Sequence, residues 1–221
     1  MPKVTDEYLA GKRNFILECT NEILKEKPLY QVTMRDIIKK AGFSQGAIYR
    51  YYANIDEIYV DLINKNPISN LLEQRIDYLV SSEQTIQSVV SDCIVSIGEY
   101  IEELLKSIGG KTCFELLVTY AYDAEKRNEI FPKLQFKQSL EYAQNKIVEY
   151  LMQKMQEGVL QTSISVDSLI MFTGISIDGI MQSVAMNTDK TLIDVPEMFQ
   201  TLAKALISFL EEPHIDKRDG K

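Results

Sequence analysis

The stretch Thr33–Tyr52, TMRDIIKKAGFSQGAIYRYY, contains two short amphipathic segments separated by a glycine. Thr33 precedes the first segment, whose apolar residues follow helical spacing, so we expect a threonine-capped helix over residues 34–41. Gly42 stands where a left-handed residue ends a helix, and Ser44 is suited to cap a second short helix. Helix, tight turn and helix in this order predict a helix-turn-helix, whose second helix enters the major groove of DNA.

The polar, small and aromatic side chains of this stretch suit contacts with duplex DNA. Arginine, hydroxyl and tyrosine groups donate to phosphates, whereas a glutamine or a small side chain on the second helix can face base edges. A glycine in that helix lets it approach the sugar-phosphate wall closely. We therefore expect DNA contacts from Thr33, Arg35, Ser44, Gln45, Gly46, Ala47, Tyr49, Arg50 and Tyr51.

Other interpretations exist for some residues of this stretch. Tyr49 and Tyr51 suit phosphate walls but also suit the core of a small domain. Lys39 and Lys40 either approach phosphates or are solvated charges. The residues that we expect in the core are Ile37, Phe43, Ile48 and Tyr52.

Residues 13–59 resemble the N-terminal domain of the TetR family of transcriptional regulators. The resemblance implies a homodimeric, ligand-responsive, DNA-binding repressor. Its motifs are Thr33, Ile37, Ala41-Gly42-Phe43-Ser44, Gly46-Ala47-Ile48 and Tyr49-Arg50-Tyr51-Tyr52.

The sequence departs from the family pattern at three positions. Pro28 stands where the family usually has glycine, and Ile38 replaces a commoner alanine. Ile55 replaces a lysine, which removes a phosphate contact that the resemblance would imply. Backbone N–H groups of the helix that starts at Ile55 remain available for that contact.

Helical spacing recurs throughout the chain and predicts an all-α fold of about nine helices. We expect a three-helix DNA-binding domain over residues 1–54 and a larger helical bundle for ligand binding and dimerisation over 55–221. Residues 213–221 are expected to form a disordered tail, and Pro67 is expected to kink a long helix. The expected helices cover residues 6–26, 34–41, 45–51, 55–78, 84–107, 111–125, 129–157, 166–186 and 195–212.

Charge is distributed unevenly along the 221 residues. The whole chain has a net charge of −8, yet residues 1–52 contain nine Lys/Arg and six Asp/Glu, a net charge of +3. The remaining residues contain 15 Lys/Arg and 26 Asp/Glu, a net charge of −11. A basic end on an acidic body is typical of a protein that meets a polyanion with one end only, although a small excess of charge in a short window also arises by chance.

The residue inventory excludes much enzyme chemistry. The single histidine, His214, lies in the polar tail, so histidine-dependent nucleophilic catalysis and histidine-ligated metal sites cannot be assembled. Cys19, Cys93 and Cys113 lack metal-type spacing and are expected to be reduced thiols. We expect no enzyme activity, no cofactor and no metal site.

Neither terminus nor interior suggests contact with a membrane. The N-terminal residues include no apolar region of the kind found in export signals. The uncharged apolar run over residues 168–177 is too short to span a bilayer. We therefore expect a cytoplasmic protein.

The C-terminal helices are expected to form a dimer interface. The helix over residues 166–186 is apolar on two faces, which predicts burial on two sides. The alternative is that both faces contribute to a core within one chain. The expected interface residues are Phe172, Ile175, Gly179, Phe199, Leu202, Leu206 and Phe209.

Aromatic residues in the body are candidates for an effector pocket between helices, although aromatic residues at helical spacing are more often core. Glu115 lies inside an apolar run, so its carboxylate meets either solvent, an ion-pair partner or a ligand in a cavity. The expected pocket is formed by Tyr100, Phe114, Glu115, Val118, Tyr142, Phe172 and Ile175.

Together these features predict a repressor that binds a palindromic DNA operator as a dimer and is released by a small apolar or aromatic effector. Two alternatives remain: a helical small-molecule binder or enzyme with a non-functional helix-turn-helix, and an activator that uses the same DNA-reading helix.

Overall fold

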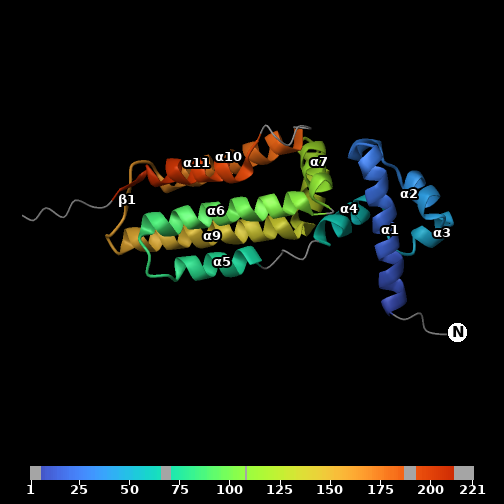
Figure 1. Ribbon diagram of the computed structural model, residues 1–221, viewed down its shortest axis with the longest axis horizontal. Coiled ribbons are helices and arrows are strands. Elements are labelled where there is room, and N and C mark those ends of the chain that lie inside the picture. Colours follow the sequence, from blue (N-terminus) through green and yellow to red (C-terminus); the bar gives the residue numbers. More distant parts are fainter. Residues whose placement is uncertain (1–5, 66–70, 108, 187–192, 212–221) are drawn as a thin grey trace, which may run out of the picture. The chain divides into compact units, whose positions relative to one another are not determined.

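The computed structural model describes residues 6–65, 71–107, 109–186 and 193–211, and His214 and the expected tail lie outside them. The all-α prediction is confirmed. Figure 1 labels most of the elements. The α-helices of the described part are α1 (Asp6–Glu26), α2 (Met34–Ala41), α3 (Gln45–Ile48), α4 (Ile55–Asn64), α5 (Leu71–Val80), α6 (Ile86–Lys106), α7 (Gly110–Tyr120), α8 (Ala124–Ile130), α9 (Gln135–Gln156), α10 (Val166–Met186) and α11 (Val195–Ile207). The shorter elements are the 3-10 helices η1 (Leu29–Gln31) and η2 (Phe131–Lys133) and the strands β1 (Gln161–Thr162) and β2 (Leu210–Glu211).

The structure contains more helices than the nine that we expected, because two expected helices are interrupted. The helix expected from Ile55 to about residue 78 ends at Asn64, and α5 begins at Leu71. A proline one to three residues beyond a helix is a common stop signal. Pro67 itself, and hence the expected kink, lies outside the described residues.

The second interruption lies between α8 and α9. The expected helix over residues 129–157 is divided by η2, which contains Pro132 near its start. Proline has no N–H to donate to the preceding turn, and its ring collides with that turn, so a helix seldom continues through a proline. The adjacent helix α7 ends at Tyr120 because Asp123 caps α8, accepting the N–H of Lys126 at 3.0 Å.

The chain folds into two compact units. Unit 1 comprises Met1–Pro67 and Leu104–Lys137, and unit 2 comprises Ile68–Glu103 and Gln138–Lys221. This division differs from the boundary expected after residue 54, because α4, α7 and α8 pack with the N-terminal helices.

In unit 1, α1 packs against α2 on one side and α4 on the other (Figure 1). The inward face of α1 carries the apolar stripe that its spacing predicts, and all four residues of that stripe are buried. They are Ile16, Cys19, Ile23 and Leu24.

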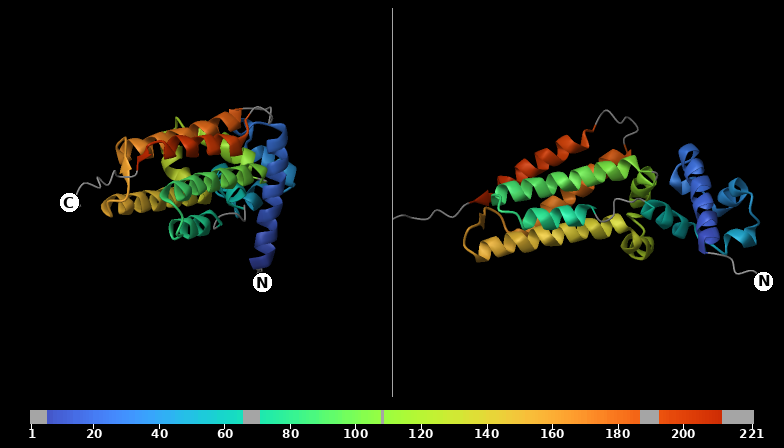
Figure 2. Two further views of the ribbon diagram at one scale, coloured as in Figure 1. Left: turned by 60° about the vertical axis from the view of Figure 1, so that its left-hand side comes forward. Right: turned by 60° about the horizontal axis from the view of Figure 1, so that its bottom comes forward.

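The long helices of unit 2 run roughly along one another (Figures 1 and 2). Tyr142 on α9 donates a hydrogen bond to Asp77 on α5 at 2.8 Å. Gly98 on α6 allows close packing, because a Cβ there would lie 2.6 Å from the side chain of Phe199 on α11. Bulky Phe199 is thereby fully buried in unit 2.

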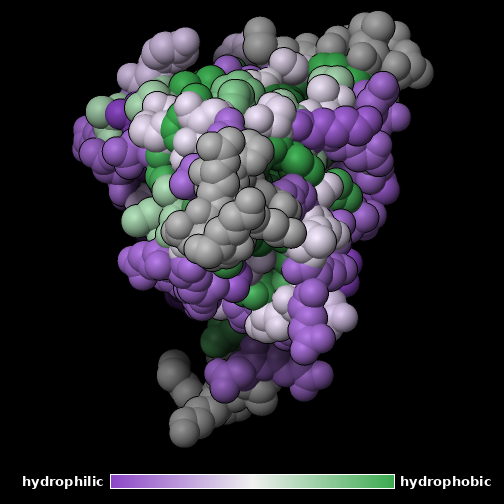
Figure 3. Space-filling view, turned by 90° about the vertical axis from the view of Figure 1, so that its left-hand side faces the viewer, coloured by the Kyte–Doolittle hydropathy of each residue, from purple (hydrophilic) through white to green (hydrophobic). Residues whose placement is uncertain are grey.

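A small antiparallel sheet, which the sequence analysis did not predict, closes one end of unit 2. Gln161 pairs with Glu211 and Thr162 pairs with Leu210. Figure 3 faces this end and shows apolar groups exposed between hydrophilic side chains. Val159, which lies just before β1, is one exposed apolar residue of this region.

The three cysteines are all free and buried. Burial raises the pKa of each thiol, to about 12 for Cys93. Across the residues for which the structure gives a position, there is no helix with the length and apolar character needed to cross a membrane.

Candidate nucleic-acid interface

The helix-turn-helix begins with a complete capping box. The hydroxyl of Thr33 accepts the N–H of Asp36 at 3.2 Å, and the Asp36 carboxylate accepts the N–H of Thr33 at 3.0 Å. The capping box thus satisfies two N–H groups at the start of α2. The Thr33 cap is confirmed, and it fixes where α2 begins.

Gly42 produces the turn between α2 and α3. Its φ of 67° is in the left-handed region, which a residue with a Cβ rarely adopts. Ser44 then caps α3 by accepting the N–H of Ala47 at 3.3 Å. The helix expected over residues 45–51 ends at Ile48, and a hydrogen-bonded turn follows in which Tyr51 donates its N–H to the Ile48 carbonyl at 2.8 Å.

Buried side chains hold α3 in place. Ile37 and Ile48 are fully buried, and Tyr52 is only 2% exposed. The Tyr52 hydroxyl donates to Asp61 on α4 at 2.6 Å, and burial together with this carboxylate raises the pKa of the phenol. The guanidinium of Arg13 on α1 lies 4.9 Å from the centre of the Tyr52 ring. The recognition segment, which we define as α3 and the turn after it (residues 45–52), is therefore held against both α1 and α4. The expected core residues Ile37, Ile48 and Tyr52 are buried, whereas Phe43 is only partly buried.

The expected DNA contacts all retain access to solvent. Tyr49 is 45% exposed, whereas Ala47 and Tyr51 are half-buried. The Tyr51 carbonyl accepts a hydrogen bond from Arg13 at 2.8 Å, which fixes the backbone at the end of the recognition segment. The exposed candidates are Thr33, Arg35, Ser44, Gln45, Gly46, Tyr49 and Arg50.

Ion pairs separate the basic residues of this region into two groups. Lys27 pairs with Asp36 at 3.1 Å and Lys40 pairs with Glu22 at 2.8 Å, so their charges are partly neutralised. Within the described parts of the chain, three bases close to α2 and α3 have no carboxylate partner. They are Arg35, Lys39 and Arg50.

Lys12 is a further cation beside this surface that the sequence analysis did not single out. Its ammonium lies 5.4 Å from the ring centre of Tyr8 and 5.3 Å from that of Phe43, in the turn between α2 and α3. The i, i+4 spacing of Tyr8 and Lys12 was a visible signal, but the approach of Phe43 depends on tertiary packing.

Helix α4 begins with a second pair of reciprocal caps. Asn54 accepts the N–H of Glu57 at 3.0 Å, and the Glu57 carboxylate accepts the N–H of Ala53 at 2.7 Å. Ile55, which occupies the position where the family usually has lysine, is half-buried.

The residues expected in an effector pocket are divided between the two units. Phe114, Glu115 and Val118 belong to unit 1, whereas Tyr100, Tyr142, Phe172 and Ile175 belong to unit 2. The Glu115 carboxylate accepts the N–H of Leu29 at 2.8 Å and pairs with Lys111 at 3.4 Å. Of the alternatives for Glu115, the structure shows the ion pair, together with a hydrogen bond to the backbone.

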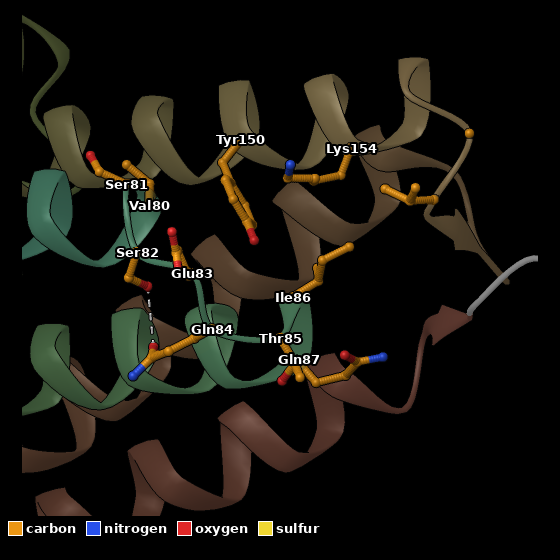
Figure 4. A pocket seen from close by; sticks show the side chains of 12 residues that line it. Val80, Ser81, Ser82, Glu83, Gln84, Thr85, Ile86, Gln87, Tyr150 and Lys154 are labelled. Carbon is orange, nitrogen blue, oxygen red and sulfur yellow. Dashed lines mark hydrogen bonds between the residues drawn. The ribbon is translucent and has the colours of Figure 1, made fainter.

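One hollow of about 630 Å³ lies in unit 2 (Figure 4). In Figure 4, the side chains of Tyr150 and Lys154 extend from α9 beside the loop between α5 and α6. The hollow is open and lined by both polar and apolar groups, and its lining includes none of the residues expected in the pocket. The lining residues are Val80–Gln87, Tyr150, Lys154, Gly158 and Val159.

The residues expected in a dimer interface differ in exposure. On α10, Ile175 is 66% exposed and Phe172 is 40% exposed, and the Phe172 ring meets that of Phe209 edge-on at 5.9 Å. Gly179 is also exposed. Three of the expected residues on α11 are instead buried within the chain: Phe199, Leu202 and Leu206.

Comparison with known proteins gives a family match over the first four helices. The model of "Bacterial regulatory proteins, tetR family" matches residues 16–62. The HTH-type transcriptional regulator YfiR of Bacillus subtilis (strain 168), itself uncharacterized, is 26% identical over 160 residues, 72% of this chain and 71% of that protein. The uncharacterized HTH-type transcriptional regulator YvdT of the same organism is 35% identical over 74 residues, 34% of this chain and 36% of that protein.

Solved structures share the fold of the described chain. The transcriptional regulator FadR from Bacillus subtilis, in complex with stearoyl-CoA, gives a TM-score of 0.58 at 18% identity over 89% of this chain and 98% of that one. SmeT, the repressor of the Stenotrophomonas maltophilia multidrug efflux pump SmeDEF, gives a TM-score of 0.59 at 15% identity over 90% of both chains. At these identities the likeness shows the fold alone.

Proposed function

We propose that this chain, a transcriptional regulator with the DNA-binding domain and the fold of the TetR family, is a homodimeric cytoplasmic repressor. It binds a palindromic operator and releases it when a small apolar or aromatic effector binds. The observation that carries the proposal is the exposed face of α3 and its flanking turns, where capped helix ends, unpaired bases and an exposed tyrosine lie together.

We assign the phosphate contacts to Arg35, Arg50 and Tyr49, because their donors are exposed and have no carboxylate partner among the described residues. Ser44 and Tyr51 add further hydroxyl donors beside them. The Thr33 hydroxyl donates to the Asp36 carboxylate at 2.8 Å, so in this assignment Thr33 acts by fixing the start of α2. Gln45 and Ala47 face base edges in this assignment, since they occupy the first turn of the recognition helix.

Gly46 has a separate role in this assignment. Apart from its chain neighbours and its own helix backbone, no described atom lies within 4 Å of the position that a Cβ would take at Gly46, so packing inside the protein does not require glycine there. Close approach of the helix to the DNA backbone is a reason for the missing side chain.

The dimer contact in this proposal lies on the exposed face of α10. Met171 and Ile175 are about two-thirds exposed, at 65% and 66%, and Phe172 lies beside them. Large exposed apolar groups that follow one another on a helix are typical of an interaction surface. A second copy of this chain would place its recognition helix about 34–36 Å from the first, one turn of DNA.

Acyl-CoA is the first effector class to test. FadR from Bacillus subtilis was solved in complex with stearoyl-CoA, and it shares the fold of this chain. An effector lowers DNA affinity only if it binds the DNA-free form more tightly than the DNA-bound form. Fatty acids, flavonoids and hydrophobic cations form the remaining panel.

The proposal is tested by selecting bound duplexes from a random DNA pool and mapping the selected sequence to neighbouring promoters. We expect a palindromic sequence with half-sites about one helical turn apart. Adding the effector should release the selected duplex, and thermal shift should report its binding. Failure to enrich any duplex, combined with a thermal shift by small molecules, would favour the helical small-molecule binder instead. Increased transcription from the bound promoter would favour an activator.

A further inference from the structure

Helix α4 carries a buried acid that the proposed DNA contacts do not use. Asp56 lies in the first turn of α4 and is 4% exposed. It accepts hydrogen bonds from the Tyr120 hydroxyl on α7 and from the Lys126 ammonium on α8, and Lys126 forms an ion pair with it. Burying a carboxylate is costly unless it is paired and hydrogen-bonded, and Asp56 satisfies both conditions.

The two hydrogen-bond donors to Asp56 keep their protons near neutral pH. The hydrogen bond to Asp56 raises the pKa of Lys126, so the ammonium remains charged. Burial and the same carboxylate raise the pKa of Tyr120, so the phenol keeps its proton as a donor. Lys126 and Tyr120 can therefore both donate to Asp56 at the start of α4 near neutral pH.

The other end of α4 is also held by η2 and by the start of α9. The Asn64 side chain donates to the carbonyl of Lys133 at 2.8 Å and accepts the N–H of Gln135 at 2.9 Å. Gly109, just before α7, approaches so closely that a Cβ there would lie 2.6 Å from the carbonyl oxygen of Leu62. Contacts at both ends leave α4 little freedom to shift against α7, α8 and η2.

The same helices also reach the segment that leads into the helix-turn-helix. Leu29, the first residue of η1, donates its N–H to Glu115 on α7 and accepts a hydrogen bond from Tyr59 on α4 at 3.2 Å. Since η1 joins α1 to α2, both α4 and α7 define the start of the DNA-binding motif.

We propose that Asp56, Tyr120 and Lys126 are positioning residues for operator binding, which lock α4 to α7 and α8 so that the DNA-binding helices and these two helices move as one body. This inference rests on the proposed function. Joint movement of these helices differs from a tilt of α4 alone, because α4 cannot change its angle against α7 and α8 without breaking the hydrogen bonds to Asp56. None of the three residues touches DNA in this proposal.

The test compares Lys126→Met and Tyr120→Phe with Lys133→Met. Lys133 lies only seven residues from Lys126, and its side chain pairs with Glu129 on the surface, so Lys133→Met removes the same charge without touching Asp56. Operator affinity is measured against salt concentration, and hydrogen exchange of the α4 amides is measured without DNA. Tyr120→Phe is the milder variant, since it removes one hydroxyl only.

We expect Lys126→Met and Tyr120→Phe to weaken operator binding about threefold to tenfold, with an unchanged salt slope because no phosphate contact is lost. Hydrogen exchange at the start of α4 should become faster in both variants. Lys133→Met should leave α4 exchange and operator affinity near their original values, and Lys126→Arg, which keeps the charge, should restore part of the affinity.

Two results would overturn the inference. One is a folded Lys126→Met protein that binds the operator as tightly as Lys133→Met does. The other is unchanged exchange of the α4 amides in Lys126→Met and Tyr120→Phe. If the unmodified protein binds no duplex at all, the proposed function fails, and the exchange measurement still decides whether the cluster fixes α4.

Discussion

The tyrosines of the recognition segment show how side-chain environment separates adjacent residues of one type. Tyr52 is enclosed between Arg13 and Asp61, whereas Tyr49 projects into solvent. The sequence pattern correctly predicted Tyr52 as core, but left Tyr49 open because helical spacing in so short a helix does not define which face is inside. The exposure of Tyr49 removes the core alternative and leaves it available as a phosphate donor.

Arg50→Ala should weaken binding to every DNA sequence and make the dependence of affinity on salt shallower. Each lost phosphate contact should reduce the slope of log affinity against log salt by about 1. Lys40→Ala is the matched control, since Lys40 is paired with Glu22 rather than free. Filter binding at several salt concentrations measures both. Equal slopes for Arg50→Ala and Lys40→Ala would contradict the assignment of Arg50.

Gln45→Ala should change sequence preference rather than general affinity. Loss of a bidentate base contact removes about 1–3 kcal/mol of discrimination at one base pair. Tyr49→Phe provides the contrast, because a lost phosphate donor lowers the affinity for all duplexes alike. Binding to single-base variants of the selected operator measures the change. Equal losses on the operator and on random DNA would rule out base reading by Gln45.

At the scale of elements, local signals were reliable where the chain supplies its own caps and stops. The bounds of α1, α2 and α10 agree with those expected, and Thr33, Ser44, Asn54 and Asp194 all cap helices. The break between α8 and α9 was missed, although Pro132 was visible in the sequence. The apolar stripe of this expected helix begins only at Phe136, after the proline, so helical spacing did not support a helix through residue 132.

Gly42→Ala should destabilise the protein, whereas Gly11→Ala should stabilise it. A Cβ in the left-handed conformation of Gly42 costs about 1–2 kcal/mol, whereas replacing glycine by alanine within an exposed helix such as α1 gains up to about 1 kcal/mol. Neither substitution meets a described atom within 4 Å, so backbone conformation alone separates them. Urea denaturation of both variants measures the difference in unfolding free energy. Equal stabilities would contradict the role of φ at Gly42.

At the scale of the whole molecule, assignments that depend on tertiary packing were the hardest to predict. The apolar residues of α11 suggested an interface. Instead, Phe199 fills the space that Gly98 leaves on α6, and these two residues lie more than a hundred positions apart in the sequence. Likewise, the hydrogen bonds that join α7 and α8 to α4 connect residues more than sixty positions apart, so no local sequence pattern predicts them.

In the proposed dimer, Ile175→Glu should give a monomer and reduce operator affinity, because a charge on the exposed α10 face would be desolvated in the proposed interface. Met152→Glu on α9 is the control, since Met152 is also an exposed apolar residue but lies outside the proposed contact. Sedimentation measures the mass of both variants. A dimeric Ile175→Glu protein would place the subunit contact elsewhere.

The three buried cysteines can report transient opening of the protein core. A buried thiol with a raised pKa cannot react with an alkylating reagent until the surrounding core opens. Cys19 and Cys113 report on unit 1, and Cys93 reports on unit 2. Timed alkylation followed by mass spectrometry would therefore reveal, with no added label and no substitution, whether the two units loosen together or one before the other.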